Sequence, residues 1–320
     1  MTALVLTSRA DTTADFVIDA FNRSGSAVFR LDFAEFPTQA EITARFDGHD
    51  WTGRISSGQR SLSLDQLTGI YYRRPTMPVL PIDMTEAERE FASREIRLGY
   101  GGLLASLSEA LWINHPRRLA AAEASKPRQL QLAAADGLAV PRTLITADPQ
   151  HAGEFVRELG GTVALKPFGS GGFSDPEGYK IAYARRMTAS DIDDESIRHT
   201  AHQLQEWIDT DFAVRLITLD NRSFAAAIHP GSAKARIDWR SDYASLTYQT
   251  INAPSHIQDG IQRLHASLGL RFSASDFLVD RDGTWWFLET NPNGQWAWID
   301  CLADDIASAI AIALTEGPTS

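Results

Sequence analysis

Apolar runs alternate with amphipathic segments through the first third of the chain. Residues 3–8 (ALVLTS) and 27–33 (AVFRLDF) have the character of strands, and residues 14–25 repeat their apolar positions with helical spacing and end at Gly25. A strand, a helix and a strand in this order favour a small parallel sheet. Residues 51–75 predict a β-hairpin that leads into a further strand.

A long helix is predicted over residues 85–111, where Thr85 and Glu88 have the spacing of a capping box. Three glycines inside its period follow no strand, so close helix packing explains them better than phosphate binding: Gly99, Gly101 and Gly102.

Similar alternation continues from residue 113 to the end of the chain. The pattern predicts, in order, helix 117–135, strand 143–146, helix 152–159, strand 162–168, a glycine-rich loop with a returning strand, a helix from the acidic segment 191–196, and strand 204–208. The predicted order ends with two strands, a helix, two more strands and a helix over residues 303–314. We therefore expect an α/β (α+β) protein with an N-terminal α/β domain (1–112), a central unit (113–204) and a C-terminal unit (205–320).

Composition limits the classes of partner. A net charge of −11 over 320 residues argues against binding to a nucleic-acid backbone. No apolar run is long enough to span a membrane, and the N-terminus lacks the pattern of a signal peptide, so we expect a cytoplasmic protein. The single cysteine, Cys301, excludes an internal disulfide and a CxxC zinc site, and is expected to be a small buried hydrophobic residue.

Lysine is rare in this chain, where arginine fills nearly all basic positions. Of 30 basic residues only four are lysines: Lys126, Lys166, Lys180 and Lys234. A compact, flexible point charge suits phosphate contact, so each is a candidate for such a position.

The segment after Lys166 has two readings. Lys166 interrupts an apolar strand and precedes Gly169-Ser170-Gly171-Gly172. Glycine N–H groups can approach phosphate oxygens while the lysine supplies charge. A hairpin turn with a lysine that extends to solvent explains the pattern equally well, and the order of residues is not that of a P-loop.

A second candidate site lies near the C-terminus. Glu289 and Asn291 are two residues apart on a predicted strand, so both side chains point to one face. A hairpin turning at Asp282-Gly283 places Asp276 on the neighbouring strand, near Glu289. Such an oxygen-only set suits magnesium that holds nucleotide phosphates. The alternative is a strand followed by a Pro-Asn-Gly turn.

The sequence over about residues 113 to 316 resembles the ATP-grasp fold. Four features carry the resemblance and occur in the expected order: the Lys126 helix, the lysine–glycine loop, the Gln-Glu-Trp-Ile segment and the carboxylate hairpin. Enzymes of this fold use ATP and magnesium to convert a carboxylate into an acyl phosphate, which an amine or hydroxyl attacks. The chain is most similar to the graspetide (microviridin-type) ribosomal peptide maturases, on the motifs Tyr72-Arg73-Arg74-Pro75, Asn114-x-Pro116, Lys126-x-x-Gln129-Leu130, Asp238-Trp239-Arg240 and Leu288-Glu289-x-Asn291-Pro292-Asn293-Gly294-Gln295-Trp296.

The resemblance implies a role for each matching residue. ATP would be bound by Lys126 and Lys166, by the loop Gly169, Ser170, Gly171 and Gly172, by the adenine hinge Gln205, Glu206, Trp207 and Ile208, and by Asp211 near the ribose. Arg215 would contact the transferred phosphoryl group, and Arg240 the acyl phosphate or the substrate carboxylate. The implied magnesium ligands are Asp276, Glu289 and Asn291.

The implied activity is that of an ADP-forming ligase which closes ester or amide rings between side chains of a ribosomally made precursor peptide with a leader. The resemblance is also compatible with a homodimer. Candidate substrate or leader contacts are Tyr72, Arg73, Arg74, Asp191, Asp193, Asp194, Glu195, Lys234 and Arg236. A solvated helix N-terminus, favoured by the helix dipole, explains the acidic residues better than leader binding does, and Tyr72 to Arg74 could simply end a strand.

Two other functions share parts of this sequence pattern. A ligase that joins a free amino acid to a peptide or small molecule needs the same ATP residues. A nucleotide-binding regulatory module would keep the fold without turnover, but it has little need for Asp276, Glu289, Asn291, Lys166 and Arg215 together.

Overall fold

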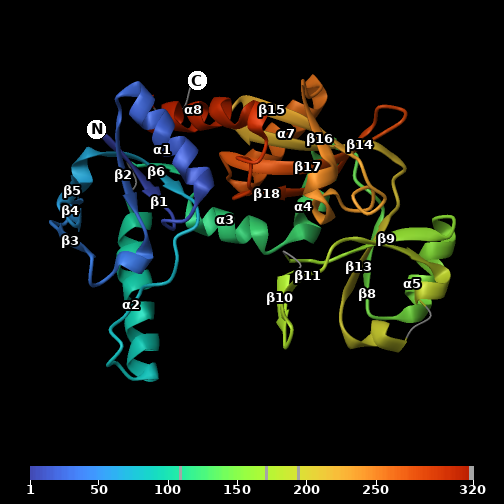
Figure 1. Ribbon diagram of the computed structural model, residues 1–320, viewed down its shortest axis with the longest axis horizontal. Helices are drawn as coiled ribbons and strands as arrows, with labels where there is room; N and C mark the ends of the chain where they lie inside the picture. The colour runs from blue at the N-terminus through green and yellow to red at the C-terminus, as the bar shows by residue number, and fades with distance from the viewer. Residues whose placement is uncertain (108–109, 170–171, 193–194, 317–320) are drawn as a thin grey trace.

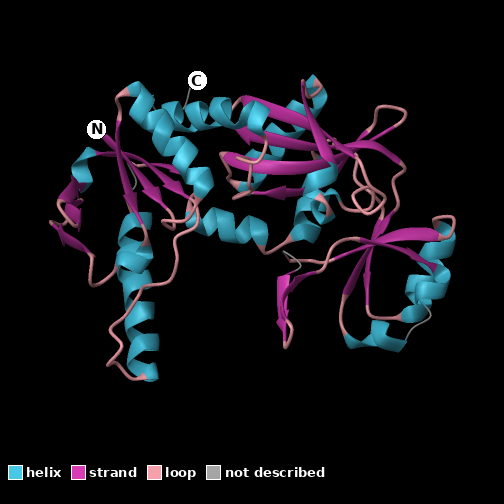
Figure 2. Cartoon of the chain, in the orientation of Figure 1, coloured by secondary structure: helices cyan, strands magenta, loops and turns pink. Residues whose placement is uncertain are grey.

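Three sheet-centred parts lie side by side in the molecule (Figure 1). The structure, a computed structural model, describes residues 1–107, 110–169, 172–192 and 195–316. Helices cover the sheets, which gives the mixed α/β architecture expected from the sequence (Figure 2). Within the described residues, no helix is both long and apolar enough to cross a membrane.

The N-terminal part contains a parallel sheet in the order β2-β1-β6-β7. Its strands are β1 (Thr2–Leu6), β2 (Ala27–Leu31), β6 (Leu67–Tyr72) and β7 (Leu111–Ile113). Helix α1 (Thr12–Ser24) ends at Gly25, whose φ of 69° is the left-handed conformation that glycine adopts without strain. A small antiparallel sheet follows, made of β3 (Ala40–Phe46), β4 (Trp51–Ser57) and β5 (Arg60–Ser63).

The long helix α2 (Glu86–Ala105) begins as predicted. The Thr85 side chain accepts from the Glu88 N–H, and the Glu88 carboxylate accepts from the Thr85 N–H, so the capping box is confirmed. The three glycines lie inside α2, and a Cβ on Gly101 would be 3.7 Å from Phe33.

The central part is an antiparallel sheet in the order β12-β9-β13-β8. Its strands are β8 (Thr143–Thr146), β9 (Thr162–Lys166), β12 (Arg185–Thr188) and β13 (His202–Glu206), with the helices α5 (Pro149–Glu158) and α6 (Ala189–Ile192). A separate hairpin consists of β10 (Gly172–Asp175) and β11 (Gly178–Ile181). Figure 1 shows this hairpin extending away from the sheet.

The C-terminal part is a five-stranded antiparallel sheet in the order β16-β15-β14-β17-β18. Its elements are β14 (Thr210–Leu219), β15 (Arg222–Pro230), β16 (Leu246–Ile251), α7 (Ser255–Leu268), β17 (Phe272–Asp280), β18 (Trp285–Asn291) and α8 (Asp300–Glu316). The helices α3 (Pro116–Glu123) and α4 (Lys126–Ala135) link it to the N-terminal part.

The N-terminal and C-terminal parts share one hydrophobic core. Helix α8 packs on α1 and β6, and the cluster joins Phe21 and Tyr71 to Trp296, Ile306 and Ile310, all fully buried. Burial of large apolar side chains is the main favourable term in folding, so these two parts stabilise each other.

The structure differs from the sequence-based expectations at several points. The helix predicted over residues 117–135 is two helices, because Pro127 lacks an N–H and suits only a first helical turn, here that of α4. Strands β3 and β16 were not predicted. β7 and β13 belong to the first and second sheets, so the expected domain boundaries near 112 and 204 fall inside strands. The prediction for Cys301 is wrong, because this residue lies on the exposed face of α8.

A buried polar chain runs beneath β17 and β18. His265 Nε2 lies 2.7 Å from Ser273 Oγ, and hydroxyl contacts continue from Ser273 to Ser275 and on to Thr290. Burial lowers the pKa of His265 from 6.5 to about 4, because an imidazolium has no water here to solvate it.

Stability should therefore fall in mild acid. Between pH 6.5 and 4 the unfolded chain holds a proton on His265 that the folded chain does not, so unfolding becomes easier by about 1.4 kcal/mol per pH unit. The free energy of unfolding, measured with urea, should decrease less between pH 7 and pH 5 in His265→Gln than in the wild type. Equal losses in both proteins would contradict this.

Candidate active site

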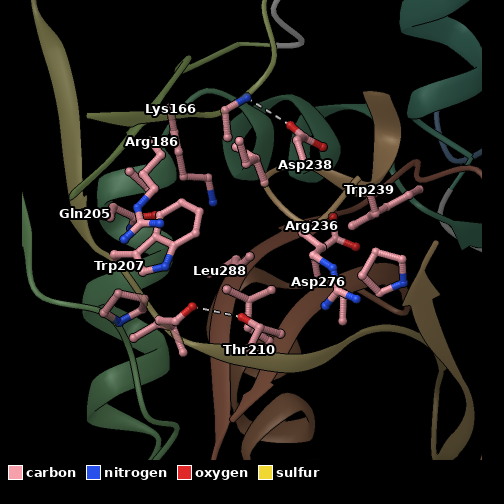
Figure 3. A pocket seen from close by; sticks show the side chains of 18 of the residues that line it. Lys166, Arg186, Gln205, Trp207, Thr210, Arg236, Asp238, Trp239, Asp276 and Leu288 are labelled. Carbon is pink, nitrogen blue, oxygen red and sulfur yellow. Dashed lines mark hydrogen bonds between the residues drawn. The ribbon is translucent and has the colours of Figure 1, made fainter. Parts of the chain in front are cut away.

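A cavity of about 420 Å³ lies between the central sheet and the C-terminal sheet, a size typical of small-ligand sites. Figure 3 shows Lys166, Gln205 and Trp207 on one side and Asp276 and Leu288 on the other. Of the predicted site residues, those lining it are Lys166, Gln205, Glu206, Trp207, Ile208, Arg236, Arg240, Asp276 and Glu289.

Two carboxylates meet at one end of the cavity. Asp276 on β17 is directly opposite Glu289 on β18, which confirms the predicted cross-strand pairing, and both are buried. A register shift follows this pair, so Leu288 is an extra residue, and such bulges re-aim side chains. The Asn291 amide lies 3.4 Å from Asp276 Oδ2 and 3.5 Å from Glu289 Oε1. Three oxygen-bearing side chains thus share one face.

Cationic groups surround Glu289. Lys126 Nζ is 2.5 Å from Glu289 Oε2, and Arg240 Nη1 is 3.9 Å from Oε1. Burial alone would raise the pKa of Glu289, but the charges of Lys126, Lys166 and Arg240 hold it at about 2. Burial raises the pKa of Asp276 despite the opposing charge of Arg215, and the nearby Glu289 carboxylate adds to the rise.

Both candidate catalytic arginines are held by carboxylates. Arg215 Nη1 donates to both oxygens of Asp276, at 2.8 and 2.9 Å, and its Nη2 donates to the Gln295 carbonyl at 2.9 Å. Arg240 donates Nε and Nη2 to the two oxygens of Asp238, at 2.9 and 2.8 Å. This fork geometry leaves Nη1 of Arg240 facing Glu289.

The donor set fits a hard divalent cation. Over the described part of the chain no group of three or more His, Cys, Asp or Glu side chains could hold a metal, so the two carboxylates here depend on Asn291 for a third ligand. Two carboxylates and a carboxamide match magnesium, which completes its shell with water and phosphate oxygens. Lys126 now occupies the space beside Glu289 that such an ion would share.

Lys166 ends β9 and points into the cavity (Figure 3). Burial lowers its pKa, although the charge of Glu289 works in the opposite direction. A poorly solvated ammonium beside an open cavity is well placed to bind an anionic ligand.

The hinge side of the cavity contains residues that the sequence did not single out. Arg186 on β12 lies over the Trp207 ring, with its Cζ 5.0 Å from the ring centroid. Asp209 and Thr210 line the cavity, whereas the predicted Asp211 is exposed and does not. The pairing of β12 with β9 brings Arg186 here, and no local signal reports that pairing.

The glycine-rich loop is described only in part. Gly169 is exposed after β9, and Gly172 begins β10. Ser170 and Gly171 lie outside the described residues. Lys180 pairs with Asp175 and Glu177 inside the β10–β11 hairpin, away from the carboxylate pair.

Arg73 was a candidate substrate contact, but only 1% of it is exposed. Its Nη1 donates to the carbonyl and the side-chain oxygen of Asn293, both at 2.7 Å, and its Nη2 donates to Gln295 Oε1. Its Nε lies 3.4 Å from the Asp11 carboxylate. Arg73 therefore supports the Asn-Pro-Asn-Gly-Gln-Trp segment from the N-terminal part and is not free to meet a substrate. Of its neighbours, Tyr72 is half-buried beside Trp112 and Arg74 is exposed.

The other candidate contacts lie apart from the carboxylates. Asp191 accepts from the N–H and hydroxyl of Thr188, and Glu195 pairs with Arg198. Asp193 and Asp194 are outside the described residues. Lys234 is exposed, 3.6 Å from Asp242, and Arg236 is an exposed residue at the cavity lining.

The position of Gly294 has no room for a larger residue. A Cβ there would overlap that of Ala274 and lie 2.9 Å from Arg215 Nη2. We expect Gly294→Ala to displace Arg215 and lower kcat by about 10²-fold, since small misplacements of catalytic groups have effects of that size. Steady-state kinetics should be compared with Gly99→Ala, whose Cβ meets open space. Equal rates in the two variants would contradict the assignment.

Comparisons with known proteins bear on the fold of the chain. The family described as the MvdD pre-ATP grasp domain matches residues 2–120. An ATP-grasp ligase from Chryseobacterium gregarium, associated with ribosomal peptide modification and solved with ADP and a leader and core peptide, has a TM-score of 0.89 at 22% identity, covering 99% of this chain and 97% of that one. The chain has the ATP-grasp fold with an N-terminal pre-ATP-grasp domain.

The chain is also similar to a macrocyclase and to a further ATP-grasp ligase. MdnC from Microcystis aeruginosa MRC, bound with its precursor peptide MdnA, has a TM-score of 0.82 at 29% identity, covering 99% of this chain and 100% of that one. The ATP-grasp ligase PsnB, complexed with a minimal precursor, Mg and ADP, has a TM-score of 0.74 at 22% identity, covering 98% and 97%. Among curated proteins, none matches this chain.

Proposed function

We propose that this protein is an ATP- and magnesium-dependent macrocyclase which joins side chains of a ribosomally made precursor peptide through ester or amide bonds. The observation that carries the proposal is the convergence of Lys126, Lys166 and Arg240 on the Asp276–Glu289 pair at one end of the cavity. Phosphoryl transfer depends mainly on such positioning and neutralisation of charge. A module that only binds nucleotide has no need for this set.

Each side chain has a place in the reaction. Lys126 and Lys166 bind nucleotide phosphates, and the hinge Gln205 to Ile208 borders the base. Asp276, Glu289 and Asn291 would hold Mg²⁺, which would neutralise phosphate charge when bound. A move of Lys126 from Glu289 to a phosphate would free that carboxylate for the ion. Arg215 and Arg240, fixed by Asp276 and Asp238, bind the transferred group and the substrate carboxylate.

Ring closure takes place in two chemical steps. A carboxylate oxygen of the peptide forms a bond to the γ-phosphorus as the bond between that phosphorus and the β,γ-bridging oxygen breaks, and ADP leaves. A hydroxyl or amine of the same peptide then adds to the carbonyl carbon and gives up a proton, and phosphate leaves with the oxygen it received. The peptide loses one water for each ring.

The peptide partner is proposed from the relatives. MdnC is bound with its precursor peptide, and the Chryseobacterium gregarium ligase with a leader and a core peptide. We infer that this chain also binds a leader-bearing precursor.

Mass spectrometry of a short peptide encoded beside this gene, after incubation with the protein, ATP and magnesium, tests the proposal. We expect stepwise loss of water, with one ADP formed per ring. A mass gain equal to an added amino acid would identify a free-amino-acid ligase instead. An unchanged peptide with no ADP formed from any supplied carboxylate would overturn the proposal in favour of a regulatory module.

A further inference from the structure

The Asp238 carboxylate connects the two sides of the cavity. Asp238 lies in the segment between β15 and β16 of the C-terminal part. Its Oδ2 accepts from the Ala184 N–H at 3.0 Å, which Figure 3 shows as the dashed line that ends at Asp238. Ala184 directly precedes β12, the edge strand of the central sheet. The bond therefore runs from one sheet to the other, between two residues that both line the cavity.

The same carboxylate holds Arg240. Its Oδ1 accepts from the Arg240 backbone N–H at 3.1 Å and from Nε at 2.9 Å, and its Oδ2 accepts from Nη2 at 2.8 Å. Oδ2 is thus shared between Arg240 and Ala184. Asp238 is only 6% exposed, so little water is available to replace a donor that is lost.

The strand that follows Ala184 leads directly to Lys166. In the pairing of β12 with β9, Arg185 lies opposite Leu165, and Lys166 is the next residue and the last of β9. Lys166 and Arg240 both line the cavity, from the central and the C-terminal part respectively. A short path of hydrogen bonds, through Asp238 and the paired strands, therefore joins these two cations.

We propose that Asp238 is a positioning residue that sets Arg240 relative to Lys166 across the cavity. The inference rests on the proposed function, which assigns nucleotide phosphates to Lys166 and the substrate carboxylate to Arg240. A carboxylate that served only to hold Arg240 would need the three donors of that residue and no other. The fourth donor, from Ala184 of the other sheet, passes the position of the central sheet to the guanidinium.

Removal of the Ala184 donor in the full-length protein tests this role. Ala184→Pro has no N–H, yet it leaves the three bonds between Asp238 and Arg240 in place. We expect kcat for ADP formation with the precursor peptide to fall about tenfold, since small misplacements of reacting groups have effects of this order. The affinity for ADP, measured by calorimetry, should stay close to that of the wild type. If Asp238 served Arg240 alone, kcat would not change.

A double-mutant cycle separates the loss of this bond from other effects of proline. Asp238→Ala removes the acceptor and should lower kcat by at least about 10²-fold, because Arg240 also loses its support. In the Asp238→Ala background, Ala184→Pro should lower kcat by no more than about twofold further, since the bond it breaks is already absent. Full additivity of the two effects, or a wild-type kcat in Ala184→Pro, would overturn the proposal.

Amide hydrogen exchange provides a readout that does not depend on turnover. Exchange at Ala184, resolved by NMR, should be about tenfold faster in Asp238→Ala than in the wild type, the effect of one lost hydrogen bond. Asp242→Ala is the matched control, because Asp242 lies in the same segment but its Oδ2 accepts from Ser232. In this control both the exchange at Ala184 and kcat should match the wild type.

The exchange result also separates this proposal from the proposed function. Unchanged exchange at Ala184 in Asp238→Ala would overturn the proposal, even if Ala184→Pro failed to fold. A wild type that forms no ADP from any supplied carboxylate would overturn the proposed function instead. The exchange rates would then still decide whether Asp238 connects the two sheets. Far-UV circular dichroism checks that each variant is folded.

Discussion

Replacing Glu289 with glutamine should lower kcat for magnesium-dependent ADP formation by at least about 10²-fold, the size of effect seen when a group that stabilises transition-state charge is removed. The side chain keeps its shape but loses the charge that Lys126 now meets at 2.5 Å. It also loses affinity for a hard cation, leaving Asp276 as the single nearby carboxylate. ADP formation with the precursor peptide, followed over a range of magnesium concentrations, is the measurement.

The magnesium dependence separates this effect from simple misfolding. Glu289→Gln should need more magnesium for half-maximal rate, and far-UV circular dichroism at the assay temperature should show that it remains folded. Glu154→Gln, the same change at a half-buried residue of α5 that does not line the cavity, should alter neither rate nor magnesium dependence. A Glu289→Gln enzyme with wild-type kcat would remove this residue from the metal site.

Replacing Arg73 with methionine should lower the free energy of unfolding by about 3–5 kcal/mol, because the change leaves a buried carboxylate without its cation. Asp11 would lose that partner, and Asn293 and Gln295 would lose a donor each. Chemical denaturation followed by far-UV circular dichroism measures the loss. A decrease below about 1 kcal/mol would show that the guanidinium does not hold the two parts together.

Arg9→Met is the matched control, since the same truncation removes a largely exposed arginine 3.5 Å from Glu35. A surface pair of this kind is worth about 1 kcal/mol at most. Arg73→Met should also lower kcat while the protein remains folded. The Gln295 carbonyl accepts from Arg215, so loosening the segment that Arg73 holds would move the proposed catalytic side chain of Arg215.

Local sequence was sufficient for features whose partners are close in the chain. The Thr85–Glu88 capping box depends on residues three apart, and the Asp276–Glu289 pairing depends on a single tight turn. Residue type and strand alternation were enough to predict both. The order of such pieces also indicated the ATP-grasp fold.

Features that depend on distant partners required the tertiary structure. Arg73 and Asn293 are 220 residues apart, and nothing beside Tyr72-Arg73-Arg74 distinguishes a buried support from a substrate contact. Arg186 reaches the cavity through a strand pairing that its own segment does not report.

The sequence by itself therefore determined which side chains are candidates for the chemistry, since residue type fixes which positions can supply a carboxylate, an ammonium or a guanidinium group. Only the tertiary structure decided which of them face the cavity and which are neutralised by one another. Lys126 forms an ion pair with Glu289, and Arg215 forms one with Asp276. Burial and pairing depend on the distance between groups brought together by packing, and that distance is not a property of any local segment.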